Sequence, residues 1–422
     1  MMRLRWMGVA LVVGTVVALS SAQSLAARGE ADGVRRSLNK VVASVKALGV
    51  PGGVIGVAGG PVGRYAKAFG VAGPGKRMRL EDHFRIGSVS KTFTATAILE
   101  LVDRHRLRLD ETIARWEPKL PNAKRITIRM LLGMRSGIWD EGGAGPSGRQ
   151  SLLAKWTNQH CALRAAKPDC GRFWSPQAII NLAVKEGRAA YPPGVYYYSD
   201  TNYVLLGLIA QKVTHKPFGK LVQQLILKPL HMRQTSFPTR RLTLPTPATS
   251  GYVAFPRKAP KHYLPGTVPS PSTLFGAGNM VSTLHDLRSW ARALATGALL
   301  EPATQRVRLD VIPIGGAFYP LKGSGFRSTL PVSYGLGIAR AGNLLGHNGE
   351  LDPFGYTAEL WYLRSLRGSV VVLLNSITPC QYSTLSDALA ATVSDVAFGP
   401  VASGAVSAPG FPGQSCFALP TR

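Results

Sequence analysis

The spacing of apolar and polar positions changes along the chain, and the first clear pattern is helical. In residues 32–50 the apolar side chains recur on one helical stripe, namely Val34, Leu38, Val41, Val42 and Val45. This spacing predicts an amphipathic helix at the start of the mature fold. Two apolar stretches follow, at 52–60 and 64–73, and a Gly/Pro turn separates them. They predict two short strands.

The middle of the chain has the periodicity of helices. Helical patterns dominate from about residue 86 to residue 300, and Gly- and Pro-rich connections interrupt them at 140–148 and 238–274. A helix from roughly 383 to 396 is expected near the end. Strand patterns return before that helix, in the stretches YGLGIAR, YTAELWYLR and GSVVVLLNS.

Elements from both chain ends therefore bracket a helical middle. We expect an α/β (α+β) sandwich, with an antiparallel sheet flanked by terminal helices and an inserted, mostly helical lobe at roughly residues 100–275. A cleft between two such lobes is a natural place for an active site.

The first residues have a different character. Arg3 and Arg5 precede an apolar run at 7–19, and small residues follow it. This order is typical of a secretory signal peptide, so we expect residues 1–27 to direct export. An uncleaved membrane anchor is the alternative, although the run is shorter than the roughly 20 residues that span a bilayer.

Cleavage is expected between Ala22 and Ala27. The mature protein would then consist of one large domain at 28–398 and a Gly/Pro/Ser-rich tail at 399–422. Its expected location is outside the cell or in the periplasmic or cell-wall space.

The cysteine count suits an oxidising compartment. Four cysteines allow three pairings, and pairing near with near is favoured, which joins Cys161 to Cys170 and Cys380 to Cys416. A metal site would recruit His160, which neighbours Cys161, but the chain has no paired C-x-x-C or H-x-x-x-H spacing to support it. We therefore expect neither a metal nor another cofactor.

The charge of the chain is strongly positive. Fifty Lys and Arg residues against 22 Asp and Glu give a net charge of +28, or +26 without Arg3 and Arg5. Such a charge attracts anionic partners, and cell-wall polymers or lipid head groups suit an exported protein. The basic residues are scattered and no nucleic-acid-binding motif accompanies them, so nucleic acid is not the expected partner. A basic surface that is merely solvated is the simplest explanation.

Candidate chemistry begins in the stretch RIGSVSKTFTATAILELV, at 85–102. Ser88 and Lys91 are three residues apart at the head of its apolar run, so on a helix they share one face. A serine hydroxyl needs a neighbouring base, and a lysine can serve once burial lowers its pKa. The alternative is that Ser88 caps the helix and Lys91 points into water. The bare spacing is common, because Ser37 and Lys40 repeat it off the apolar stripe of the first helix.

Two further stretches carry polar groups in a suggestive order. In YPPGVYYYSDTNYVLL, Tyr198 precedes Ser199 and Asp200, either of which can cap the helix that follows. In LLGHNGELDPFGYTAELWYL, His347 lies at the edge of a strand, beside a glycine that permits close backbone approach. Taken singly, these residues have structural explanations.

Together the three motifs resemble the serine β-lactamase and D-alanyl-D-alanine carboxypeptidase superfamily, in the branch with class C β-lactamases. That family uses S-x-x-K, then Y-x-N, then a K-T-G or H-x-G strand. Here they stand as Ser88-Val89-Ser90-Lys91, Tyr198-Ser199-Asp200 and His347-Asn348-Gly349. LLGMRSGIWD, KPLHM and GAGNMVSTLHDLRSWARAL are also similar to family stretches, and the resemblance covers roughly residues 35–395.

The resemblance implies a role for each matching residue. Ser88 would attack a carbonyl and become acylated, while Lys91 and Tyr198 would share the proton transfers. His347 would position a substrate carboxylate or polarise Tyr198. The oxyanion hole would be formed by the backbone N–H groups of Ser88 and Glu350. The substrate-binding residues implied in this way are Asp200, Asn348, Gly349 and Glu350.

Two departures from the family pattern bear on function. Asp200 stands where asparagine is usual, and a carboxylate beside Lys91 favours the ammonium form. Asp200 could instead be a cap, with Asn202 supplying the amide. Histidine at position 347 is typical of carboxypeptidase-like or esterase-like members more than of efficient β-lactamases.

The sequence thus predicts an exported serine acyl hydrolase that works through an acyl-enzyme. The favoured substrates are peptides ending in D-alanine, and the alternatives are β-lactams or esters. A catalytically weak penicillin-binding-like or cell-wall-binding protein is the alternative from another class. Oligomeric state cannot be inferred from these patterns.

Overall fold

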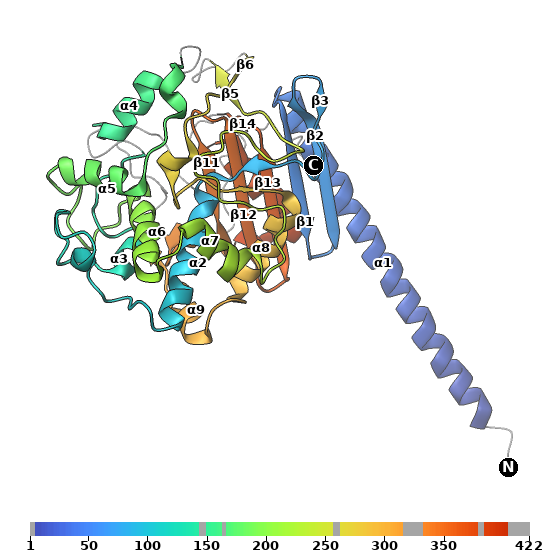
Figure 1. The fold of residues 1–422 in the computed structure, drawn as a ribbon. Coiled ribbons are helices and arrows are strands. Elements are labelled where there is room, and N and C mark those ends of the chain that lie inside the picture. Colours follow the sequence, from blue (N-terminus) through green and yellow to red (C-terminus); the bar gives the residue numbers. More distant parts are fainter. Residues whose placement is uncertain are drawn as a thin grey trace.

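A nine-stranded antiparallel sheet forms the centre of the molecule (Figure 1). The computed structural model describes residues 5–142, 149–162, 166–255, 262–314, 332–378 and 384–403. The strand order is β3-β2-β1-β13-β12-β11-β10-β9-β8. In chain order these strands are β1 (Gly52–Ala58), β2 (Arg64–Gly73), β3 (Lys76–Arg77), β8 (Ile312–Pro313), β9 (Val332–Tyr334), β10 (Ala339–Ala341), β11 (Leu344–Leu351), β12 (Tyr356–Leu363) and β13 (Gly368–Leu374).

The sheet joins the two ends of the chain. β1 pairs with β13, so that Gly53 lies opposite Leu374. The strands expected from the sequence are present as β1, β2, β12 and β13. The prediction of a single strand for YGLGIAR is wrong. β9 ends at Tyr334, a turn in which Gly337 has a φ of +69° follows, and β10 begins at Ala339.

Helices cover both faces of the sheet (Figure 1). On one face lies α8 (Leu284–Thr296), and an added Cβ on Gly56 of β1 would stand 2.4 Å from its Leu284. Behind α8 lies α2 (Ser90–Asp103), whose Phe93 ring stacks on Trp290 of α8. On the other face lies α10 (Leu385–Phe398), where Phe398 packs on Gly368 of β13. The expected helix at 383–396 is therefore present, shifted by two residues.

Shorter helices and two small sheets build the rest of the body beside the main sheet (Figure 1). The helices are α3 (Ile128–Leu132), α4 (Leu152–His160), α5 (Pro176–Lys185), α6 (Asp200–Thr214), α7 (Phe218–Val222), α9 (Pro302–Arg308) and α11 (Pro400–Ser403). A three-stranded sheet contains β5 (Tyr252–Phe255), β6 (His262–Pro265) and β14 (Ser376–Ile377), while β4 (Phe84–Arg85) pairs with β7 (Val281–Ser282). The helix α6 packs against α2, α3 and α5, which places the second motif beside the first.

One helix, α1 (Arg5–Ala47), contains both the expected signal segment and the amphipathic stretch. Its N-terminal half projects away from the body and its C-terminal half packs on the sheet (Figure 1). There the predicted stripe is buried, as Leu38 and Val45 show, whereas Ser37 and Lys40 are exposed. Among the helices of the described residues, none combines the length and the apolar character needed to cross a membrane.

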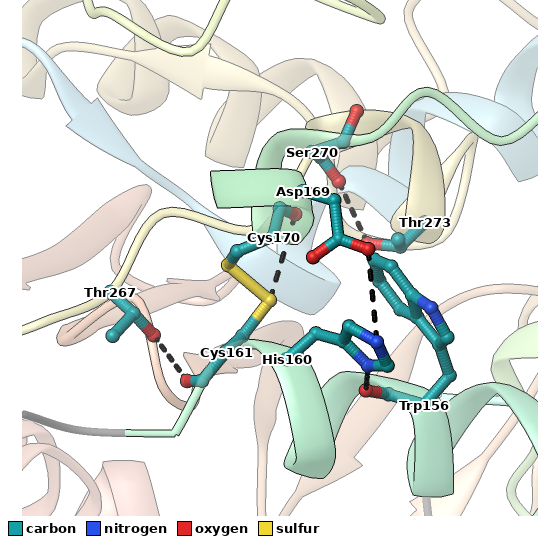
Figure 2. The surroundings of a disulfide bond; sticks show 8 residues. All are labelled: Trp156, His160, Cys161, Asp169, Cys170, Thr267, Ser270 and Thr273. Carbon is teal, nitrogen blue, oxygen red and sulfur yellow. Dashed lines mark hydrogen bonds and ion pairs between the residues drawn. A yellow bond between two sulfur atoms is a disulfide. The ribbon is translucent and has the colours of Figure 1, made fainter. Parts of the chain in front are cut away.

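A disulfide between Cys161 and Cys170 joins the end of α4 to the 3₁₀ turn at 168–171 (Figure 2). His160, the candidate metal ligand, has its Nδ1 2.8 Å from the carbonyl oxygen of Trp156 and its Nε2 3.7 Å from Asp169. These contacts and the disulfide account for the side chains of this cluster. Cys380 and Cys416 lie outside the described residues.

Candidate active site

Ser88 lies in a short 3₁₀ turn, Gly87–Val89, that leads directly into α2. The helix is central to the fold, because all residues from Ser90 to Leu101 are buried. Val89 is the N-cap residue of α2, and no side chain forms a capping hydrogen bond at this end of the helix. Ser88 is therefore not the helix cap that a purely structural explanation requires.

Lys91 is completely buried one helical turn after Ser88. Its Nζ lies 2.8 Å from Ser88 Oγ, 3.0 Å from the carbonyl oxygen of Ala277 and 2.6 Å from Asp200 Oδ1. Burial lowers the pKa of Lys91, although the nearby Asp200 carboxylate acts in the opposite direction. The geometry of the first motif is thus that of a hydroxyl in direct contact with a desolvated amine.

Tyr198 comes from the loop before α6 and lies beside the amine. Its ring centre is 4.8 Å from Lys91 Nζ, and the ring is 6.4 Å from that of His347 and 6.5 Å from that of Tyr334. The structure therefore brings the three sequence motifs together, although they are far apart in the chain.

Asp200 is the first residue of α6, and its carboxylate points at Lys91. The preceding Ser199 does not cap the helix with its side chain, because its hydroxyl donates to the carbonyl oxygen of Trp139. Asp140 supplies the cap from another loop, since its Oδ1 accepts the N–H of Asp200 at 2.9 Å. Burial, followed by the charge of Asp200, raises the pKa of Asp140 to about 8.

Sequence reasoning missed Asp140. The residue ends the stretch LLGMRSGIWD, but no spacing connects it to a partner 60 positions later.

Asn202 does not substitute for Asp200 at the amine. Its Oδ1 accepts a hydrogen bond from Ser136 Oγ at 2.5 Å, and its Nδ2 lies 3.4 Å from Met134 Sδ. The same sulfur lies 3.5 Å from the N–H of Ser199. Met134 thus holds the second motif in place, and the amide alternative for Asn202 is wrong.

His347 is a buried, neutral imidazole. Its Nδ1 is 2.5 Å from the carbonyl oxygen of Asn348, which can only accept, so Nδ1 carries the hydrogen. Its Nε2 then accepts from the Tyr334 hydroxyl at 3.1 Å. Burial, with the Lys91 charge as second cause, lowers the pKa of His347 to about 3. His347 therefore supplies no positive charge for a substrate carboxylate at neutral pH.

Two glycines let β11 lie directly against the Ser88 turn. A Cβ on Gly349 would stand 2.2 Å from the carbonyl oxygen of Ile86 and 3.0 Å from Ser88 N. Gly87 has a φ of +51°, and its Cβ would stand 3.0 Å from Glu350 N. The backbone nitrogens of Ser88 and Glu350 thus border the same close contact, as an oxyanion hole between them requires.

Side chains on the other face of β11 are directed at α10. Asn348 Nδ2 donates to Asp387 Oδ1 at 3.0 Å. Burial, followed by the charge of Asp387, raises the pKa of Glu350 to about 8. The side chains of Asn348 and Glu350 therefore lie next to α10, and the part of Glu350 that borders the Ser88 turn is its backbone nitrogen.

With this geometry established, the family can be identified by comparison. The profile of the Beta-lactamase family matches residues 38–392. The chain belongs to this family. It has the fold shared by serine β-lactamases and penicillin-binding proteins, which is the fold of a serine hydrolase.

Three known proteins show how far the similarity extends. The putative penicillin-binding protein PbpX of Bacillus subtilis (strain 168) is 28% identical over 216 residues, which make up 51% of this chain and 47% of PbpX. The esterase EstB of Burkholderia gladioli is 26% identical over 346 residues, or 74% of this chain and 82% of EstB. A crystal structure of a D-stereospecific amidohydrolase from Streptomyces sp. matches with a TM-score of 0.68 and 28% identity, covering 86% of this chain and 97% of the other. The matched part of the chain covers about half the length of PbpX. It covers 39% of a second relative, penicillin-binding protein 4* of Bacillus subtilis (strain 168).

Proposed function

We propose that this protein is an exported serine acyl hydrolase that forms an acyl-enzyme on Ser88. The observation that supports it most directly is the 2.8 Å contact between Ser88 Oγ and the buried Nζ of Lys91. A serine hydroxyl becomes a useful nucleophile when such a base takes its proton.

The roles of the site residues follow from their positions. Ser88 Oγ attacks the substrate carbonyl while its proton passes to Lys91. The backbone N–H groups of Ser88 and Glu350 stabilise the oxyanion, and Tyr198, beside the amine, takes part in delivering a proton to the leaving group. Water then attacks the acyl-enzyme, and the same groups return the proton to Ser88.

The favoured substrates carry a carbonyl next to a D-amino acid. Peptides ending in D-alanine are the first candidates, because the three motifs resemble those of carboxypeptidases of this family. The similarity to a D-stereospecific amidohydrolase from Streptomyces sp. supports the same stereochemistry. The neutral state of His347 favours substrates whose binding does not depend on a cation at that position, which extends the set to D-amino acid amides.

An esterase activity is supported separately by EstB, which aligns with most of this chain. Hydrolysis of β-lactams is also part of the proposal, because it would use the same acylation of Ser88. The signal-like first 27 residues and the charge of +28 support export to an anionic cell-wall environment.

A catalytically weak penicillin-binding protein is the second candidate, and one observation favours it. Asp200 lies 2.6 Å from Lys91, and an ion pair of this kind stabilises the ammonium, which is not a base. In that case Ser88 would be acylated slowly and the acyl group would remain attached.

Acylation by a fluorescent penicillin tests both candidates. We expect a covalent adduct on the wild-type protein and none on Ser88→Ala. Ser37→Ala is a matched control, because Ser37 belongs to the second, exposed S-x-x-K spacing. An adduct that forms equally on Ser88→Ala, or on neither protein, would overturn the proposed function.

A substrate panel separates the activities. It contains a D-Ala-D-Ala peptide, a D-amino acid amide and its L-enantiomer, a chromogenic cephalosporin and a short-chain ester. Turnover of the D-peptide or the D-amide above the L-amide supports the D-specific hydrolase. A penicillin adduct together with turnover of the ester alone supports an esterase, and a stable adduct without turnover of any substrate supports the second candidate.

A further inference from the structure

The three contacts of Lys91 differ in what they can do with a proton. An ammonium has three N–H donors, and the oxygens of Ser88, Ala277 and Asp200 lie at 2.8, 3.0 and 2.6 Å from its nitrogen. A backbone carbonyl does not hold a proton at ordinary pH, and the Ser88 hydroxyl is the group to be deprotonated. The Asp200 carboxylate is the contact among these three that can accept a proton from Lys91.

Lys91 has no direct route to solvent in this arrangement. Its side chain is 0% exposed, whereas that of Asp200 is 19% exposed. A charged amine cannot take the Ser88 proton until it has lost one of its own. Transfer to Asp200 Oδ1 is therefore the shortest way to obtain the neutral amine.

A second carboxylate lies behind Asp200. Asp140 Oδ1 accepts the N–H of Asp200 at 2.9 Å and that of Gly142 at 3.2 Å. A Cβ on Gly142 would stand only 2.8 Å from Asp200 Oδ2, so the loop carrying Asp140 packs directly on the Asp200 carboxylate. After burial, the charge of Asp200 is the next cause that raises the pKa of Asp140, so the negative charges of the two carboxylates oppose each other.

We propose that Asp140 and Asp200 form a carboxylate pair that takes a proton from Lys91 and so prepares it as the base for Ser88, which rests on the acyl hydrolase function proposed above. Asp200 receives the proton, and Asp140 holds Asp200 in place and opposes its negative charge. Both act through Lys91, so they are positioning residues.

The proton balance of this step is closed. An N–H bond of Lys91 breaks as an O–H bond forms on Asp200. The neutral amine takes the Ser88 proton as Oγ attacks, and passes it to the leaving group. In deacylation the amine takes a proton from water and returns it to Ser88, after which Asp200 gives its proton back to Lys91.

The charge state of Asp140 controls this transfer. The pKa of Asp140, at about 8, responds more to the charge of Asp200 than to that of Lys91. A negative charge on Asp140 therefore opposes the negative charge of Asp200, and this repulsion favours transfer of the Lys91 proton.

In the described part of the chain, two tyrosines and a histidine also face the amine, and Tyr197 faces Asp140, with burial raising the pKa of this tyrosine. The rings of Tyr198 and Tyr203 lie 4.8 and 5.9 Å from Lys91 Nζ, and the charge of Lys91 affects His347 from β11. Burial raises the pKa of Tyr203 and lowers that of His347 to about 3, so neither changes charge near pH 8. We therefore expect the acylation rate constant of the wild-type protein to rise as the pH passes through about 8.

A double-mutant cycle tests the pair. Acylation by the fluorescent penicillin is measured from pH 5.5 to 9.5 on the wild type, Asp140→Asn, Asp200→Asn and the double variant, with thermal unfolding of each. Asparagine at 140 keeps an oxygen for the Asp200 N–H but cannot ionise. Asp110→Asn is the matched control, because Asp110 is exposed and its ion pair is with Arg108, which is also exposed.

We expect Asp140→Asn to acylate about tenfold or more slowly above pH 8, the scale of a partial loss of general-base catalysis, and to lack the rise near pH 8. In the Asp200→Asn background the same change at 140 should have no effect, because the carboxylate that it assists is absent. Asp110→Asn should match the wild type.

Several outcomes of this experiment would overturn the proposal. A wild-type rate with no rise near pH 8, an Asp140→Asn profile equal to that of the wild type, or an equal loss in both backgrounds would overturn the pair. Asp200→Asn acylating orders of magnitude faster than the wild type would also overturn it and make the ion pair inhibitory. Absence of any Ser88-dependent adduct would instead be a failure of the proposed function.

Discussion

Gly349 on β11 and Ile86 before the Ser88 turn are in backbone contact, so close that a Cβ on Gly349 would stand 2.2 Å from the Ile86 carbonyl oxygen. No side-chain rotation can relieve this contact, because the obstructing atom belongs to the backbone. The contact keeps the backbone nitrogens of Ser88 and Glu350 next to each other.

Gly349→Ala is expected to push β11 away from the Ser88 turn. Displacing one oxyanion donor costs about 10²-fold or more in rate, so the acylation rate constant should fall by at least that amount. Overpacking should lower the free energy of unfolding by about 1–3 kcal/mol. Gly33→Ala is the control, since only the tip of Arg36 lies within 4 Å of its Cβ position. Unchanged acylation in Gly349→Ala would contradict the role given to this contact.

His347 is expected to affect the rate of acylation but not its pH dependence. Its pKa of about 3 keeps the imidazole neutral throughout the working range. His347→Gln should lose a hydrogen bond worth about 1.4 kcal/mol, or about tenfold in rate, while the midpoint of the pH profile stays unchanged. Acylation rates of both proteins from pH 5 to 9 check this. A shifted midpoint in the variant would mean that His347 ionises in this range.

The carboxyl of Glu350 is expected to make the folded state less stable at high pH. Its pKa rises from 4.5 to about 8 on folding, so the folded protein holds this proton more tightly than the unfolded chain does. The resulting stability is fully present below pH 4.5 and is lost as the pH rises through about 8.

Urea unfolding at pH 5 and pH 8.5 measures this effect. The wild type should lose on the order of a few kcal/mol between the two values through this group, and Glu350→Gln should lose distinctly less. An equal loss of unfolding free energy in the two proteins would show that the fold does not hold this carboxyl protonated.

The Cys161–Cys170 disulfide closes a short loop at the end of α4. Replacing both cysteines by serine should lower the free energy of unfolding by about 2–3 kcal/mol, because the unfolded chain gains the freedom of that loop. Urea unfolding under oxidising conditions checks the value. A loss near zero would show that the disulfide does not restrict the unfolded chain in this way.

The sequence predicted the features that depend on periodicity and spacing. The stripe of Leu38 and Val45 is buried as expected, the S-x-x-K residues Ser88 and Lys91 are in contact, and the possible conflict between Asp200 and Lys91 is present as an ion pair. Each of these follows from residues that are close in sequence or that share a family motif.

The rest depends on contacts between distant segments, which no local pattern reports. Asp140 caps α6 across 60 positions, and Tyr334 at the end of β9 donates to His347 of β11. The charge state of His347 could not be predicted from the sequence either, since it follows from burial and from the neighbouring Lys91.

The pairing of β1 with β13 has a consequence for biosynthesis. The central hydrogen bonds of the sheet require a strand from each end of the sequence, so they cannot form until translation of the domain is almost complete. The nascent chain already carries Ser88 and Lys91, but β11, which completes their surroundings, emerges from the ribosome much later. The site around Ser88 is therefore completed only after the C-terminal strands have been made, although its nucleophile and base are among the first residues of the domain to be synthesised.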